Sequence, residues 1–124
     1  MSKANAAKKP AIVAAVRDVE NPLSTLCPIV MMPKDFHPND YTTYETGSRS
    51  PRELYGLLVD QFDYLYDEGA TSPKVMSVTM HPFLAGRAYR AKIFRDFMRH
   101  ARAHPNVWFA RGVDIADWWR KQNS

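Results

Sequence analysis

Cysteine is almost absent from this chain of 124 residues, and long apolar runs are missing altogether. The single cysteine, Cys27, excludes an internal disulfide and is typical of a reducing compartment, so we expect a cytoplasmic protein. Cys27 has no flanking base, which favours a buried, inert thiol over a nucleophile. No run approaches the roughly 18 apolar residues that a membrane span requires. The apolar patch at 11–16 is too short for the core of a signal peptide and lacks a clear cleavage site.

Motifs that mark several enzyme classes are also missing. The sequence has no glycine-rich phosphate loop and no Gly-x-Ser-x-Gly nucleophile elbow. A zinc site needs three or four convergent cysteine, histidine or carboxylate ligands, and neither His-Glu-x-x-His nor Cys-x-x-Cys occurs. His100 and His104 lie four residues apart on one expected helix face, but the sequence shows no third ligand near them. Protonated histidines at a helix end also complement the helix dipole, so we predict no metal site and no cofactor in this chain.

What the chain does have is basic charge, concentrated in one stretch. The formal net charge is +4, and residues 87–111 carry seven basic side chains against one acid, Asp96. A basic helix can bind nucleic acid or an acidic polymer, or it can present a solvated outer face. Aromatic side chains do not alternate with these charges as a base-stacking surface requires, which favours the solvated face. The basic residues are Arg87, Arg90, Lys92, Arg95, Arg99, Arg102 and Arg111.

Three segments have helical periodicity. The first begins at an expected N-cap, Ser50, and Glu53 closes a capping box with it. Gly69 is expected to end this helix in a left-handed conformation. A second helix is predicted over about 88–103, and Asp114 is expected to cap a last, short helix. The apolar residues of these helices are Leu54, Leu57, Leu58, Phe62 and Leu65, then Ile93, Phe94, Phe97 and Met98, then Ile115, Trp118 and Trp119.

Three short apolar segments alternate with these helices and are predicted to be strands: Pro28–Met32, Val75–Met80 and Val107–Ala110. The resulting order, β-loop-α-β-α-β-α, predicts an α/β fold with right-handed crossovers and a parallel sheet. A sheet of three strands leaves two exposed edges, so we expect part of a larger (β/α) barrel or sheet. Residues 1–22 are expected to be a flexible leader, and residues 23–124 to form the partial barrel domain.

One histidine lies where chemistry collects in an α/β fold. His81 directly follows the apolar segment 75–80, and Pro82 and a Gly86-Arg87 pair come after it. Catalytic groups gather at the carboxyl edge of parallel strands, and an imidazole can pass a proton to a departing amine or alkoxide near neutral pH. A lone histidine is more often structural, but the residues that follow make a functional role equally compatible with the sequence. We predict His81 as the catalytic residue, with Pro82 and Arg87 beside the substrate.

The loop over residues 34–49 is the second candidate region. It is rich in proline, asparagine, aspartate and threonine and shows no periodicity, which is typical of a functional or lid-like loop. Asn39 and Asp40 follow the end of the first predicted strand, where they can bind substrate or orient His81. The alternative is turn chemistry, because Pro-Asn-Asp is a common turn signal.

The order of these motifs resembles the C-terminal part of the polysaccharide deacetylase (NodB-like) superfamily, in particular its allantoinase-like and peptidoglycan-deacetylase-like branch. The resemblance covers about residues 28–119 and depends on the segments 75–82, 86–90 and 107–116. It implies a distorted (β/α) barrel that hydrolyses amide-type carbon–nitrogen bonds, in N-acetyl sugars or in small cyclic and linear amides. In that family a metal-bound water attacks the carbonyl, and the histidine that matches His81 protonates the departing nitrogen.

The resemblance also implies parts that this chain lacks. A complete member would hold a divalent, zinc-type metal through an upstream Asp-Asp pair and His-x-x-x-His ligands, which have no counterpart before residue 28. We therefore expect a C-terminal segment that is inactive alone and forms a homo- or hetero-oligomer or binds a complementing upstream half. The alternative is a non-catalytic interaction module, or a truncated relic, that pairs with a partner chain through its open sheet. Neither a membrane nor a nucleic acid is expected as a partner.

Overall fold

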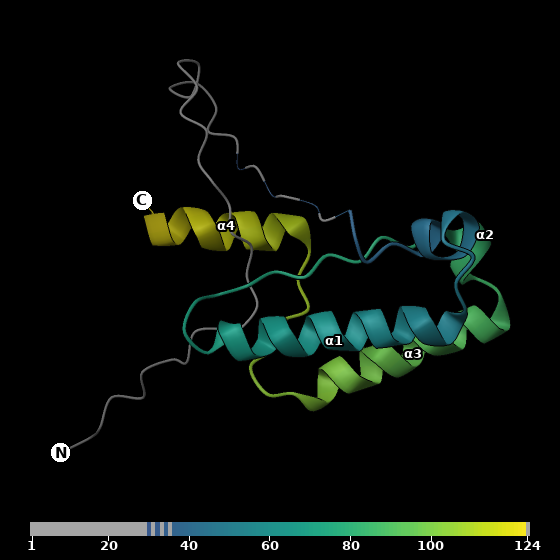
Figure 1. Ribbon diagram of the computed structural model, residues 1–124. Helices are drawn as coiled ribbons and strands as arrows, with labels where there is room; N and C mark the ends of the chain where they lie inside the picture. Colours follow the sequence, from purple (N-terminus) through teal and green to yellow (C-terminus); the bar gives the residue numbers. More distant parts are fainter. Residues whose placement is uncertain (1–29, 31, 33, 35, 124) are drawn as a thin grey trace.

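A computed structural model describes residues 30, 32, 34 and 36–123, and the named elements within them are helical (Figure 1). A π-helical turn, η1 (Thr42–Thr46), precedes the long helix α1 (Pro51–Gly69). Helices α2 (Pro82–Ala85), α3 (Ala88–Ala103) and α4 (Gly112–Asn123) follow. Helices α1 and α3 pack side by side, and irregular chain connects this pair with α4 (Figure 1). None of the described helices is long and apolar enough to cross a membrane.

Helix α1 begins as the sequence predicts. The Glu53 N–H donates to Ser50 Oγ at 3.4 Å, and the Ser50 N–H donates to Glu53 Oε2 at 2.6 Å, which completes the capping box. The expected left-handed stop at Gly69 is wrong, because Gly69 is the last helical residue and the following Ala70 has a φ of −62°. The Ala70 N–H donates to the Asp67 carbonyl at 3.2 Å, so a tightened last turn ends the helix instead.

The seam between α1 and α3 holds the main core. Leu54, Leu58 and Phe62 of α1 are at most 2% exposed, and Phe97 of α3 is 4% exposed. The Phe62 and Phe97 rings meet edge to face, with centroids 6.0 Å apart. Burying each such side chain stabilises the fold by about 1.5–3 kcal/mol, so this seam fixes one helix against the other. The predicted apolar stripe is confirmed at its centre, although Leu57 is 40% exposed.

The basic stretch forms a solvated face, as predicted, with one exception. Lys92, Arg95, Arg99 and Arg102 are exposed on α3. Arg90 is only partly exposed, because its guanidinium carbon lies 4.1 Å from the centre of the Tyr44 ring. A cation held over an aromatic face is attracted by the ring quadrupole, so Arg90 ties α3 to η1 and does not project into solvent.

Helix α4 begins at Gly112, before the residue that was expected to cap it. Asp114 lies in the first helical turn, where its carboxylate accepts from the Arg111 N–H at 3.2 Å and from the Arg111 Nε at 2.9 Å. These hydrogen bonds lower the pKa of Asp114 and place its negative charge at the positive end of the helix dipole. Ile115 is buried and anchors a second apolar cluster that includes Trp108 and Trp118.

The predicted strands are wrong for the described residues. Segments 75–80 and 107–110 run as irregular chain and form no strand ladder with described residues. A parallel bridge pairs Asn39 with Thr79. A strand forms only where a neighbouring strand satisfies its backbone groups, and among the described residues these segments make no such ladder. The partial (β/α) barrel is therefore not confirmed. The leader 1–22, Cys27 and most of the predicted strand 28–32 lie outside the described residues.

The loop over 34–49 is more ordered than its composition suggests. Thr43 and Tyr44 of η1 are buried, and the Thr43 Oγ1 donates to the Asn39 carbonyl at 2.8 Å. The Gly47 N–H donates to the Thr42 carbonyl at 2.9 Å, and a Cβ at Gly47 would lie 2.8 Å from that same oxygen. Only glycine permits this close approach. The centre of this loop is therefore helical, although the sequence shows no periodicity there.

Candidate active site

Two segments that are far apart in the sequence meet at the bridge between Asn39 and Thr79. The Thr79 N–H donates to the Pro38 carbonyl at 3.1 Å, and the Asp40 N–H donates to the Thr79 carbonyl at 3.2 Å. These two bonds set the register of the pairing. Since each residue advances the chain by about 3.3 Å in an extended stretch, the register brings Asp40 beside His81.

Asp40 and His81 form a tightly coupled pair. The Asp40 side chain is fully buried, and its Oδ1 lies 2.7 Å from the His81 Nδ1. Its second oxygen accepts from the backbone N–H of His81 at 2.9 Å. Both carboxylate oxygens therefore bind one residue, which satisfies a charge that is costly to bury alone. The loop over 34–49 thus supplies the carboxylate, and the segment after residue 80 supplies the imidazole.

This geometry determines which nitrogen of His81 is free. A carboxylate only accepts hydrogen bonds, so the Nδ1 facing Asp40 carries the proton. In the neutral ring the Nε2 is then unprotonated, and in the charged ring it carries a transferable proton. The His81 side chain is 35% exposed, so this nitrogen is accessible from solvent. An imidazole oriented by a buried carboxylate is suited to general acid–base chemistry.

His81 forms part of the wall of a pocket of about 480 Å³. The Tyr41 and Phe83 rings flank the imidazole, each with its centroid 5.7 Å from that of His81. Across the pocket the His37 Nδ1 lies 3.3 Å from the Thr42 Oγ1. The pocket thus combines aromatic faces with hydroxyl, amide and imidazole groups, a mixture that suits a small polar ligand. Its lining residues are Phe36, His37, Asn39, Tyr41, Thr42, Thr46 and His81.

The structure brings together three of the five predicted site residues. Asn39 lines the pocket, but its Oδ1 accepts from the Tyr41 N–H at 2.9 Å, so the predicted turn chemistry is present. Of the two roles open to Asp40, the geometry supports orienting His81, because a fully buried side chain cannot touch a ligand in the pocket. Pro82 is the first residue of α2, and Arg87 caps α3 and is exposed. Neither is among the residues that line the pocket.

Sequence reasoning missed two features around this pocket. His37 and Tyr41 belong to the pocket wall, and the only signal for them was their position beside Asn39 and Asp40. Tyr44 was also missed: its hydroxyl is buried without a hydrogen-bond partner among the described residues. Burial raises the pKa of Tyr44, and the Arg90 charge over its ring opposes part of that rise.

The prediction that His100 and His104 have no third ligand nearby is wrong. Asp63 of α1 reaches across the helix seam, and its Oδ1 lies 2.7 Å from the His100 Nε2. In the described part of the chain these three side chains are the group close enough together to hold a metal ion. Sequence proximity could not reveal this ligand, because it lies on a different helix.

Comparisons with known proteins find similar curated proteins. No protein-family model matches the sequence. Among curated proteins, the chain is 35% identical over 68 residues to a Schizosaccharomyces pombe protein assigned as a polysaccharide deacetylase. It is 30% identical over 101 residues to the peptidoglycan deacetylase of Helicobacter pylori, a match that covers 82% of this chain. The chain spans only 21% and 31% of the lengths of these two relatives.

Two solved structures are similar as well. A crystal structure assigned as a polysaccharide deacetylase from Pseudomonas aeruginosa PAO1 matches 76% of the chain with a TM-score of 0.69 and 36% identity. The crystal structure of Puue allantoinase matches 86% of the chain with a TM-score of 0.77 and 33% identity. The matches cover 32% and 35% of those chains. The resemblance predicted from the order of the sequence motifs is confirmed.

Proposed function

Because the chain belongs to the polysaccharide deacetylase superfamily, we propose that it is the C-terminal segment of a hydrolase of amide-type carbon–nitrogen bonds. His81 is the general acid in this proposal, and Asp40 is its positioning residue. One observation carries the proposal. The two oxygens of the buried Asp40 carboxylate bind the His81 Nδ1 at 2.7 Å and the His81 backbone N–H at 2.9 Å, and His81 lines an open pocket. Deacetylase and allantoinase, the names of these relatives, denote the hydrolysis of such bonds.

The proposed step uses the accessible nitrogen of His81. Water adds to the amide carbonyl and gives one proton to a base outside these residues, and the carbon–nitrogen bond then breaks with its electron pair remaining on nitrogen. The imidazolium gives its Nε2 proton to that nitrogen, which leaves as a neutral amine. Asp40 keeps the ring oriented and stabilises its charged form before the transfer. A group in this role contributes about 10²–10⁴-fold to the rate.

The residues around His81 do not fit the zinc-type metal that the family implies. Both Asp40 oxygens are engaged by His81, and the His37 Nδ1 faces the Thr42 hydroxyl, so no set of three ligands converges in the described pocket. The group that activates the attacking water is proposed to come from outside these residues.

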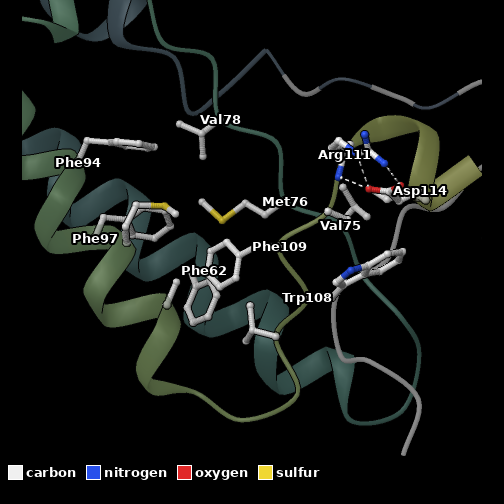
Figure 2. Close-up of a pocket in the computed structure, with 15 residues that line it drawn as sticks. Phe62, Val75, Met76, Val78, Phe94, Phe97, Trp108, Phe109, Arg111 and Asp114 are labelled. Carbon is white, nitrogen blue, oxygen red and sulfur yellow. Dashed lines mark hydrogen bonds and ion pairs between the residues drawn. The ribbon is translucent and has the colours of Figure 1, made fainter.

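We propose that a complementing chain supplies that group and completes a barrel. An apolar groove of about 710 Å³ lies between α3 and the irregular segments 75–78 and 107–111 (Figure 2). Val75, Met76, Val78, Phe94 and Phe109 line it, and Figure 2 shows side chains from both the helix and the irregular segments around the same space. The same two segments were predicted to be strands. Strands of a partner laid along them would satisfy their backbone groups and cover the groove.

The substrate class is a small amide or an N-acetyl sugar. The pocket at His81 has the size of a small-molecule site, and its polar groups are neutral except for the histidines. Asn39, Thr42 and Thr46 offer amide and hydroxyl groups, while Phe36 and Tyr41 offer flat apolar faces. A sugar ring or a ureide presents the same combination of hydroxyl or amide edges and less polar faces.

The groove also favours a second candidate, an interaction module without catalysis. Co-expression of the full chain with the remaining length of the Helicobacter pylori relative separates the two. We expect a complex that releases acetate from an N-acetylated sugar oligomer. His81→Ala should lower the rate by at least about 10²-fold, and Asp60→Asn, on the exposed face of α1, should not change it.

Each outcome decides between the candidates. A complex without hydrolysis favours the interaction module. Hydrolysis that survives His81→Ala removes the proposed role of that histidine but leaves the complementation standing. If no complex forms, the groove does not receive a barrel half, and both candidates are wrong for this partner.

A further inference from the structure

We propose that Asp63, His100 and His104 form a binding site for a divalent transition-metal ion of the zinc type, which joins α1 to α3. One ligand atom from each of these residues lies within 4.8 Å of the others. Asp63 comes from α1, whereas His100 and His104 come from the end of α3. None of the three lines the pocket at His81, so this site is separate from the proposed chemistry.

The spacing of the ligand atoms suits an ion between them. Zinc binds histidine nitrogen and carboxylate oxygen at about 2.0–2.2 Å, which places neighbouring tetrahedral ligands about 3.4 Å apart. The Asp63 Oδ1 and His100 Nε2 are 2.7 Å apart, and the widest separation in the cluster is within 4.8 Å. The ideal separation lies between these values. Rotations of the side chains that move these atoms by about 1 Å are therefore enough to admit the ion.

His104 is held with its Nε2 available, whereas the His100 Nε2, which faces the Asp63 carboxylate, gives up its proton when an ion binds. The His104 Nδ1 lies 3.0 Å from the His100 carbonyl oxygen, which can only accept, so Nδ1 carries the proton and Nε2 keeps its lone pair. A metal-ligating histidine commonly uses its second nitrogen in this way, because the bond to a carbonyl selects the tautomer and the ring orientation. The spacing of four residues puts both rings on one helix face, with centroids 4.8 Å apart.

Aromatic packing orients the cluster before any ion binds. The Phe62 ring meets the His100 and His104 rings edge to face, at centroid distances of 5.6 and 5.1 Å. Tyr66 packs on His104 at 4.8 Å, and its hydroxyl donates to the Pro105 carbonyl at 3.0 Å. These contacts reduce the freedom that the ligands would otherwise lose on binding, which lowers the cost of binding.

The cluster is open to an ion from solvent. The His100 side chain is 28% exposed and that of Asp63 is 47% exposed. Three protein ligands leave a fourth tetrahedral position for water. Two imidazoles and one carboxylate are ligands that zinc, nickel and copper accept, whereas magnesium and calcium prefer oxygen ligands alone. The seam beneath the cluster is the main core, so the bound ion would stabilise the α1–α3 pair.

Titration of the full chain with zinc ions tests this site. The Cys27→Ser background removes the one thiol that could compete for the metal. We expect one ion per chain by calorimetry, and a melting temperature that rises with zinc concentration, because the ion binds the folded chain. Cobalt substitution should give the visible absorption of a tetrahedral site. His100→Ala and Asp63→Asn should each weaken binding at least about tenfold, since even changes to outer-shell partners cost 10- to 100-fold.

His37→Ala is the matched control, because His37 is an exposed histidine outside the cluster. It should leave the affinity and the cobalt spectrum unchanged. His104→Gln, at the C-cap of α3, provides a second readout if His100→Ala disturbs the core. The proposal is overturned if binding is substoichiometric, if it survives loss of either cluster histidine, or if His37→Ala abolishes it.

Discussion

Replacing Asp40 with asparagine perturbs the proposed site at its most buried point. The carboxylate accepts two hydrogen bonds from His81, one from the ring and one from the backbone N–H. An amide has one accepting oxygen and one donating nitrogen, so it cannot accept both. If the oxygen stays on the backbone N–H, the amide nitrogen faces Nδ1 and forces the ring into the opposite tautomer.

The expected effects on stability and on rate follow from the same count of donors and acceptors. If the ring does not change tautomer, two donors face each other in a fully buried position, and an unsatisfied buried group costs about 1–3 kcal/mol. If the tautomer changes, stability is largely retained, but the Nε2 is protonated in the neutral ring and no longer accepts. In the complemented enzyme the rate should fall by about 10²–10⁴-fold, the range for loss of a correctly poised acid–base group.

The assay does not require an active enzyme. Long-range proton–nitrogen NMR of the histidine ring, at a pH where the ring is neutral, should show the proton on Nδ1 of His81 in the wild type and on Nε2 in Asp40→Asn. Urea denaturation followed by circular dichroism measures the accompanying loss of stability. Asp60→Asn, an exposed aspartate on α1, is the control and should change neither. A wild-type ring protonated on Nε2, or an Asp40→Asn variant identical to wild type in both measurements, would refute the reasoning.

Four further substitutions test the local structure through the free energy of unfolding. The Ser50 hydrogen bonds lower the pKa of Glu53 in the folded chain. The stability that they provide is therefore present above the unfolded pKa of Glu53 and is lost as the pH falls through its folded pKa. Glu53→Gln should flatten the fall in stability below about pH 5, as measured by circular dichroism in acid titrations. Tyr44→Phe removes a buried, unpaired hydroxyl and should raise the free energy of unfolding by up to about 1 kcal/mol in urea titrations. Because the pKa of Tyr44 is raised on folding, the wild type should lose stability as the pH rises past about 10, and the variant should not. A variant less stable than the wild type would contradict this prediction. Gly47→Ala places a Cβ 2.8 Å from a backbone oxygen and should cost about 1–3 kcal/mol, whereas Gly56→Ala, which meets nothing within 4 Å in the middle of α1, should stabilise the chain.

The helices were predictable because their signals are local. The capping box at Ser50 and the apolar spacing of α1 and α3 depend on residues within one or two turns of each other. The ends were less predictable: Gly69 continues α1 although glycine favours a left-handed stop, because the last carbonyl groups find donors in the next turn. The strands at 75–80 and 107–110 failed for the opposite reason, since strand formation depends on a neighbour that the segment itself does not encode.

The candidate site likewise has residues that the sequence predicted and pairings that only the structure revealed. His81 was recognisable from its place after an apolar segment and from the family resemblance. Its pairing with Asp40 was one of two roles that the loop composition allowed, and only the register of the bridge between Asn39 and Thr79 decided between them. The third residue of the metal cluster had no signal at all, because Asp63 and His100 are 37 positions apart along the chain.

By itself, the sequence determined where α1 begins, which faces of α1 and α3 are apolar, and which family the chain resembles. Each of these depends on residue types at short spacings, which any conformation of the chain preserves. The tertiary structure alone decided that Asp40 clasps His81, that Arg90 lies over Tyr44, and that Asp63 joins the two histidines of α3. Hydrogen bonds and ion pairs act over about 3 Å, so residues distant in sequence interact only when packing and register bring them within that distance.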